Sequence, residues 1–91
     1  MATKEKNTNF EEFRFVLGYK LRLIRECNNY TLEDMAKQTG ASQAMVALYE
    51  SGKETANLLY LLKAAEVGRV TVEDLAYMSK MEFMIKLTSV Y

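Results

Sequence analysis

Hydrophobic residues recur along most of this chain with the period of an α-helix, and polar capping residues divide the pattern into segments. The first predicted helix runs from Phe10 to Glu26, after a capping-box start formed by Asn9 and Glu12. The residues before it are polar, and we expect residues 1–9 to form a disordered arm. The side of this helix that faces the core is expected to carry Phe13, Leu17, Leu21 and Ile24.

Two short helices joined by a tight turn are predicted between Thr31 and Gly52. Thr31 can cap the first of them together with Asp34, and Gly40 can end it in the left-handed conformation. Ser42 follows at once and can cap the second helix, which ends at Gly52. A helix, a glycine-containing turn and a second helix form the supersecondary pattern that enters the major groove of DNA.

Two more helices and a tail complete the predicted order. Thr55 is expected to cap a helix that ends near Glu66, and Thr71 with Asp74 to start a short fifth helix. The apolar side of the fourth helix is expected to be Leu58 or Leu59, with Leu61, Leu62 and Ala65. The tail is expected to be a short helix or a strand, because its apolar residues fit both periods. The helical stripe is Met81, Met84, Ile85 and Thr88, and the alternating set is Phe83, Ile85, Leu87 and Ser89.

A second apolar set lies on another face of the first helix and consists of Phe15, Tyr19 and Leu23. It is expected to pack against the C-terminal segment of the same chain. The alternative is a contact with a second copy or with another partner.

The run from Leu17 to Leu75 resembles the Cro/C1-type, or lambda-repressor-like, helix-turn-helix domain of phage and plasmid repressors. The matching residues are Leu17, Gly18, Leu21, Ile24, Arg25, Leu32 to Ala36, Gly40 to Gln43, Val46, Tyr49 to Gly52, Leu62, Ala65, Val70, Thr71 and Leu75. The resemblance implies an all-α, five-helix domain with a helix-turn-helix, followed by the short C-terminal helix or strand. We therefore expect this domain over residues 10–78. The extension over residues 79–91 is expected to pack on the first helix or to form a dimer contact.

The resemblance also implies one structural ion pair. In the resembling family, the residue at the position of Arg25 pairs with the glutamate that corresponds to Glu50. Such a partly buried pair would fix how the first helix meets the third, and the loss of one partner would leave the other charge stranded.

Composition limits the classes of function. A chain of 91 residues, 49% of them hydrophobic, suits one small domain and does not suit a disordered chain. No apolar run is long enough for a membrane span and no signal peptide opens the chain, so we expect a cytoplasmic protein. Its single cysteine, Cys27, excludes an internal disulfide and agrees with a reducing compartment. Because the chain has no histidine and no phosphate-binding glycine loop, we expect neither a catalytic site, nor a metal site, nor a bound cofactor.

Charge weakens the case for a simple DNA-binding protein. Twelve Lys and Arg residues balance twelve Asp and Glu residues, which gives a formal net charge of zero. DNA affinity rests largely on neutralising phosphates, so a neutral protein binds DNA only where its basic residues share one face.

The outer face of the third predicted helix is the most informative surface. At about 100° per residue, Val46 and Tyr49 face the core. The opposite side carries the apolar residues Ala44, Met45, Ala47 and Leu48. A helix that reads DNA needs donors and acceptors on this side, and here only Gln43 suits a base edge.

The positions that hold the DNA backbone in the resembling repressors show the same trend. They correspond here to Leu32, to Ser51 and Lys53, and to the loop residues 56–58. We expect a contiguous apolar face that binds a partner, formed by Leu32, Ala44, Met45, Ala47, Leu48 and Leu58. The alternative is that this apolar face packs inside the protein, beneath the C-terminal segment.

Two functions follow, and both regulate transcription in a phage or mobile element. In the preferred one, the protein is similar to the small modulator-of-repression or antirepressor proteins of temperate phages, and its apolar face binds a partner repressor. In the alternative, it is an operator-binding repressor whose third helix enters the major groove. The DNA-binding residues would then be Ser42, Gln43, Ala44, Ala47, Leu48, Ser51 and Lys53. Neither function involves a small-molecule substrate or a membrane, and either is compatible with a homodimer.

Overall fold

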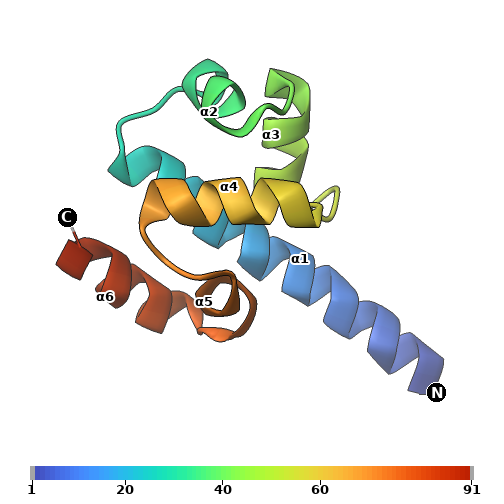
Figure 1. Cartoon of the computed structure of the whole chain (residues 1–91). Helices are drawn as coiled ribbons and strands as arrows, with labels where there is room; N and C mark the ends of the chain where they lie inside the picture. The colour runs from blue at the N-terminus through green and yellow to red at the C-terminus, as the bar shows by residue number, and fades with distance from the viewer. Residues whose placement is uncertain (1, 91) are drawn as a thin grey trace.

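The computed structural model describes the backbone of residues 2–90 and the side chains of residues 10–89, and this part of the chain is all-α. Its helices are α1 (Ala2–Cys27), α2 (Leu32–Thr39), α3 (Gln43–Ser51), α4 (Leu58–Gly68), α5 (Val72–Tyr77) and α6 (Lys80–Val90). The C-terminal half of α1 packs against the other helices, whereas its N-terminal half extends beyond them (Figure 1). The expected all-α fold is confirmed, and the tail is a helix rather than a strand.

Helix α1 begins earlier than the sequence pattern predicts. The predicted start at Phe10 is wrong, because residues 2–9 belong to the same helix. The predicted disordered arm is therefore wrong for these residues, and its first residue, Met1, lies outside the described residues. The segment contains residues of high helix propensity, such as Ala2 and Lys4, and has no proline. Extending a helix that is already nucleated adds one hydrogen bond for each residue fixed, so nothing in this segment ends the helix.

One hydrophobic core contains residues from all six helices of the described chain. Its buried members are Leu17, Leu21, Ile24, Met35, Val46, Tyr49, Ala56, Tyr60, Ala64, Ala65, Leu75, Phe83 and Leu87. Phe13, which was expected in this core, is instead 42% exposed. It lies on α1 one turn before Leu17 and lines a hollow beside Ala76 of α5 instead of entering the core.

Helix α4 turns only part of the predicted side toward the core: Ala65 is buried as predicted and Leu61 packs against the core. Asn57 caps it in place of Thr55, and the Asn57 side chain accepts a hydrogen bond from the Tyr60 N–H at 2.8 Å. The buried residues are Tyr60, Ala64, Ala65 and Gly68, whereas Leu58, Leu59 and Leu62 are exposed. Because α4 is apolar on nearly every side, its periodicity does not select the buried face.

Helix α6 packs on α1 through residues that the helical spacing did not select. Phe83 and Leu87, one turn apart, are fully buried, while Met81 and Ile85 are 68% and 60% exposed. The Nζ of Lys80 lies 5.2 Å from the centroid of the Tyr19 ring on α1. Of the second apolar set on α1, Tyr19 is therefore in contact with the C-terminal segment, whereas Phe15 is exposed. A homodimer contact through the extension stays a prediction.

Lys20 is a charged side chain in the core, where α1, α5 and α6 meet. Its Nζ donates a hydrogen bond of 2.8 Å to the Leu75 carbonyl oxygen and lies 5.9 Å from the centroid of the Phe83 ring. Burial lowers the pKa of Lys20, and the nearby carboxylates of Asp74 and Glu82 act in the opposite direction. The hydrogen bond ties the end of α5 to α1, which places α6 against the same helix.

Asp74 gives the fold a measurable dependence on pH. Its Oδ2 accepts hydrogen bonds from the Lys86 Nζ at 2.7 Å and from the Thr71 N–H at 3.0 Å. These bonds, the one from Lys86 first, lower the pKa of Asp74 below its ordinary value of 3.8. A carboxylate with a lowered folded-state pKa stabilises the fold above its unfolded pKa, and that stabilisation is lost as pH falls through the folded value.

We therefore expect Asp74→Asn to lower the free energy of unfolding at neutral pH, by an amount that shrinks as pH falls below about 4. Urea unfolding measured as a series in pH tests this expectation. Glu73→Gln, at the exposed neighbouring position, is the matched control. A gap between wild type and Asp74→Asn that stays constant down to pH values near 2 would contradict the assigned role.

Candidate functional site

Local hydrogen bonds fix α2, the turn and α3. The Asp34 N–H donates to Thr31 Oγ1 at 3.0 Å and Asp34 Oδ2 accepts from the Thr31 N–H at 2.9 Å, so the predicted capping box is present. Gly40 ends α2 with a φ of 80°, which a residue without Cβ adopts without strain. Ser42 Oγ then accepts a hydrogen bond from the Met45 N–H at 3.1 Å and starts α3.

A glycine lets α1 approach the last turn of α3 closely. A Cβ atom at Gly18 would lie 2.5 Å from the Glu50 carbonyl oxygen and 2.6 Å from that of Tyr49, which is closer than two such atoms can approach. The Arg14 Nε also donates a hydrogen bond of 3.2 Å to the Gly52 carbonyl oxygen, just after α3. The backbones of α1 and α3 are therefore in direct contact, and the position of α3 depends on α1.

Arg25 and Glu50 form the ion pair that the resemblance implied. Arg25 Nε lies 2.8 Å from Glu50 Oε2, and the two side chains are 15% and 6% exposed. The other end of the guanidinium donates a hydrogen bond of 2.9 Å to the Tyr30 carbonyl oxygen. The hydrogen bond to Glu50 raises the pKa of Arg25 above its ordinary value. The pair therefore joins α1, the loop before α2 and the C-terminal end of α3.

The six residues of the apolar face differ in exposure. Leu32 and Met45 are half-buried and pack against the core, and Leu48 is also half-buried. Ala44 and Ala47 are exposed, so α3 is not rotated inward, and α6 packs on α1 rather than over this face. Leu58 is 64% exposed but lines a different groove, between α4 and α5, together with Leu62, Val70 and Val72. The apolar face that the structure exposes on α3 is therefore smaller than the six-residue face predicted from the sequence. It consists mainly of Ala44, Ala47 and Leu48, and Leu58 belongs to another groove.

Leu32 and Ala47 share a hollow of about 200 Å³ between α1, α2 and α3. Its other lining residues are Arg22, Arg25, Glu50 and Ser51. Arg22 was not among the predicted site residues, although it lies one turn before Arg25 on the same side of α1. Its Nε pairs with Glu26 Oε2 at 3.1 Å on the surface, an exposed pair that a ligand carboxylate or phosphate can replace.

The predicted DNA contacts lie on the same end of the molecule. Gln43, Ser51 and Lys53 are exposed. The hydroxyl of Ser42 is used as the cap of α3, and Ser51 Oγ donates to the Leu48 carbonyl oxygen at 3.1 Å. Gln43 and Lys53 are therefore the side chains of the predicted set best placed to contact a base and a phosphate.

The charge of the helix-turn-helix segment opposes DNA binding. Between Thr31 and Gly52 the chain has one cation, Lys37, against the carboxylates of Glu33, Asp34 and Glu50. Lys37 Nζ lies 3.8 Å from Glu33 Oε2, and both side chains are exposed. The N-terminal end of α2, which could otherwise hold a phosphate, carries the carboxylates of Glu33 and Asp34. The exposed cations at this end of the molecule are instead supplied by Arg22 on α1 and Lys53 after α3.

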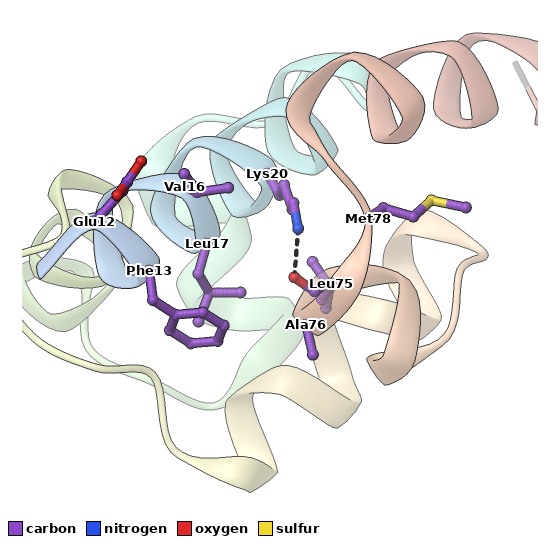
Figure 2. Close-up of a pocket in the computed structure, with 8 residues that line it drawn as sticks. All are labelled: Glu12, Phe13, Val16, Leu17, Lys20, Leu75, Ala76 and Met78. Atoms are coloured by element: carbon purple, nitrogen blue, oxygen red, sulfur yellow. Dashed lines mark hydrogen bonds between the residues drawn. The ribbon is translucent and has the colours of Figure 1, made fainter. Parts of the chain in front are cut away.

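A second hollow, of about 260 Å³, lies between α1 and α5 and is shown in Figure 2. Phe13 and Ala76 line it, and the Lys20 ammonium beside it is turned toward the Leu75 carbonyl oxygen.

Across the described residues, no group of three or more His, Cys, Asp or Glu side chains is arranged to hold a metal ion. Within residues 2–90, none of the helices combines the length and the apolar character needed to cross a membrane.

The segment that carries this site matches a family model described as Helix-turn-helix over residues 21–75, which is more than half of the chain. The chain belongs to the helix-turn-helix family of transcription regulators. This helix-turn-helix protein is 36% identical over 56 residues to an uncharacterized HTH-type transcriptional regulator, MJ0272, of Methanocaldococcus jannaschii. That alignment covers 62% of this chain and 85% of the relative. The Cro/C1-type, lambda-repressor-like fold is confirmed, while α6 lies outside the matched range.

Proposed function

We propose that this helix-turn-helix protein regulates transcription as an antirepressor or modulator, by binding a partner repressor through the outer face of α3. The supporting observation is that this face combines exposed Ala44 and Ala47 with half-buried Leu48, in a segment that carries more carboxylates than cations. Apolar side chains cannot hydrogen-bond to base edges, and carboxylates repel phosphates. The hollow beside Leu32 and Ala47 has the size to receive a side chain of the partner, and Arg22 at its edge favours an acidic neighbour.

The biological setting of this proposal is a phage or another mobile element. It rests on the resemblance to the small modulator-of-repression proteins of temperate phages. In that setting, the partner is itself a repressor with a helix-turn-helix domain, and binding would cover its DNA surface or hold it in a different complex.

Operator binding is the second candidate, and membership of the family favours it. Gln43 would contact a base, with Lys53 and Ser51 on the phosphates. The two candidates are compatible if the protein touches DNA within a joint complex with its partner.

Fluorescence anisotropy of a mixed-sequence duplex of about 30 base pairs, at about 50 mM and about 200 mM salt, separates the candidates. We expect no binding at either salt concentration. Micromolar binding that falls steeply as salt rises, and that weakens in Lys53→Ala, would overturn the antirepressor proposal and favour an operator-binding repressor.

The outer face of α3 is tested by Leu48→Asp and Ala47→Asp. Both side chains reach the surface, so we expect a folded protein that no longer retains the repressor captured by the wild type from cells of its source. Met45→Asp, by contrast, is expected to destabilise the fold, because Met45 packs against the core. Circular dichroism checks folding, and Lys37→Gln on α2, which lowers the net charge by the same one unit, is the control for a change of charge alone. Retention of the repressor by folded Leu48→Asp and Ala47→Asp would exclude this face.

A further inference from the structure

We propose that the groove between α5 and α6 is a docking site for a basic segment of a partner protein, with an arginine of that segment stacked on Tyr77. The inference goes beyond the proposed function and does not rest on it, because the groove shares no residue with the outer face of α3. Helices α5 and α6 lie on the opposite side of the molecule from α2 and α3 (Figure 1). A partner on one of these surfaces therefore leaves the other one open.

Two helices form the walls of this groove, which has a volume of about 490 Å³. Glu73 and Tyr77, one turn apart, line it from α5. Glu82 and Ile85 line it from α6. Each wall therefore combines one carboxylate with one large apolar side chain.

The fold fixes the groove at both ends. Residues 78 and 79 join α5 to α6 at one end. Further along, Lys86 Nζ on α6 lies 2.7 Å from Asp74 Oδ2 on α5. Helix α6 is also anchored in the core by the buried side chains of Phe83 and Leu87. The groove is therefore formed before a partner binds, which lowers the cost of ordering it on binding.

The apolar side chains of the groove are largely uncovered. Tyr77 is 84% exposed and Ile85 is 60% exposed. Met78, which is half-buried, lines the groove together with them. An aromatic ring exposed beside aliphatic side chains is typical of a contact with another protein.

The charges of the groove favour a basic occupant. Three carboxylates line it, those of Glu73, Asp74 and Glu82, against the single ammonium of Lys86. Lys86 is bonded to Asp74, and Glu73 and Glu82 form no salt bridge among the described residues. The ammonium of Lys80, also on α6, is turned toward α1. The groove therefore repels phosphates and attracts cationic side chains.

An arginine side chain suits both the apolar and the charged parts of the groove. A planar guanidinium stacks on an aromatic ring and donates paired hydrogen bonds to a carboxylate, whereas the ammonium of lysine acts as a point charge. With the guanidinium on the Tyr77 ring, the acceptors are Glu73 on the same wall and Glu82 on the facing wall. The aliphatic stem of the arginine, or a neighbouring aliphatic residue of the partner, then covers Ile85.

Heteronuclear NMR of the isotope-labelled full chain, titrated with a synthetic peptide of alternating arginine and leucine residues, tests this site. We expect shifts of backbone amides confined to residues 73–86, with a dissociation constant of about 0.1 mM. A peptide in which glutamate replaces every arginine is expected not to bind. The protein is also concentrated alone, to detect a second copy in the groove.

Variants of Tyr77 test the stacking of the arginine. Tyr77→Ser is expected to raise the dissociation constant for the arginine-leucine peptide about tenfold. Tyr77→Phe keeps the ring and is the matched control, expected to change the constant by less than about twofold. Because Tyr77 is 84% exposed, both variants are expected to fold.

A pair of charge variants tests the carboxylates. Glu73→Gln combined with Glu82→Gln is expected to raise the dissociation constant about tenfold. Glutamine keeps an oxygen that can accept the hydrogen bond from the Ser79 N–H, so α6 stays capped. Glu33→Gln combined with Glu54→Gln removes the same charge at exposed positions elsewhere and is expected to leave the constant unchanged.

Several outcomes would overturn the proposal. They are amide shifts on α2 and α3 instead of residues 73–86, equal binding of the glutamate peptide, and unchanged affinity of Tyr77→Ser. Shifts of residues 73–86 on concentrating the protein alone would assign the groove to a second copy instead. Spermidine binding as tightly as the peptide would assign it to a small polycation. None of these outcomes bears on the outer face of α3, which is tested separately.

Discussion

Replacing Arg25 by methionine is expected to lower the free energy of unfolding by about 3 to 5 kcal/mol, because it leaves a buried carboxylate without its partner. Glu50 is only 6% exposed and is held by Arg25 Nε at 2.8 Å. The same change removes the hydrogen bond from Arg25 to the Tyr30 carbonyl oxygen. Urea unfolding at neutral pH measures the loss. The consequence for function is direct, because this pair holds α3 at its angle to α1.

The matched control for this prediction is Arg22→Met, on the same helix. Arg22 pairs with Glu26 on the surface, and we expect its loss to change the free energy of unfolding by no more than about 0.5 kcal/mol. A double variant, Arg25→Met with Glu50→Leu, is expected to recover most of the stability, since neither charge is then stranded. Equal losses in Arg25→Met and Arg22→Met would show that burial of the Arg25 pair does not matter.

Truncating Phe83 to alanine is expected to lower the free energy of unfolding by about 3 to 5 kcal/mol, as for other large buried aromatic residues. Phe83 is fully buried in the same core as Leu21 and Val46, and its ring lies beside the Lys20 ammonium. The family match ends at residue 75, so the result would show that a helix outside the matched range completes the core. Thermal or urea unfolding provides the measurement.

Ile85→Ala provides the comparison on the same helix. Ile85 is 60% exposed, so its truncation is expected to change stability by no more than about 0.5 kcal/mol. If Phe83→Ala were no more destabilising than Ile85→Ala, α6 would be an appended helix rather than a part of the core.

The helix-turn-helix was predictable from short-range signals alone. Thr31 with Asp34, Gly40 and Ser42 act within a few residues of themselves, through caps and a left-handed turn, and the structure contains each of these features. The buried side of α3 was equally predictable, because Val46 and Tyr49 are the positions that helical periodicity turns inward.

The other predictions failed where several sides of a helix are apolar. In α4 and α6 the sequence offers more than one hydrophobic stripe, and the stripe selected by spacing is largely exposed in both helices. The prediction for Phe13 failed for a different reason, since Phe13 borders an open hollow between α1 and α5 and is 42% exposed. Hydrophobic periodicity shows that a side can be buried and does not identify the element that would bury it.

The candidate site likewise combines features that the sequence shows with features that only the packing of the helices shows. The apolar character of Ala44, Ala47 and Leu48 and the local excess of carboxylates are properties of the sequence. The sequence did not show that Leu58 lines a separate groove or that Arg22 borders the hollow beside Leu32, because both facts depend on how distant helices pack.

By itself, the sequence determined the order of the helices, the turn between α2 and α3 and the apolar outer face of α3. These follow from hydrogen bonds and side-chain directions within a single helix or turn. Only the tertiary structure decided which sides of α4 and α6 are buried, where Lys20 finds its acceptor and how much of α1 stays uncovered. The physical reason is that burial requires a second surface, and that surface comes from residues far away in the chain.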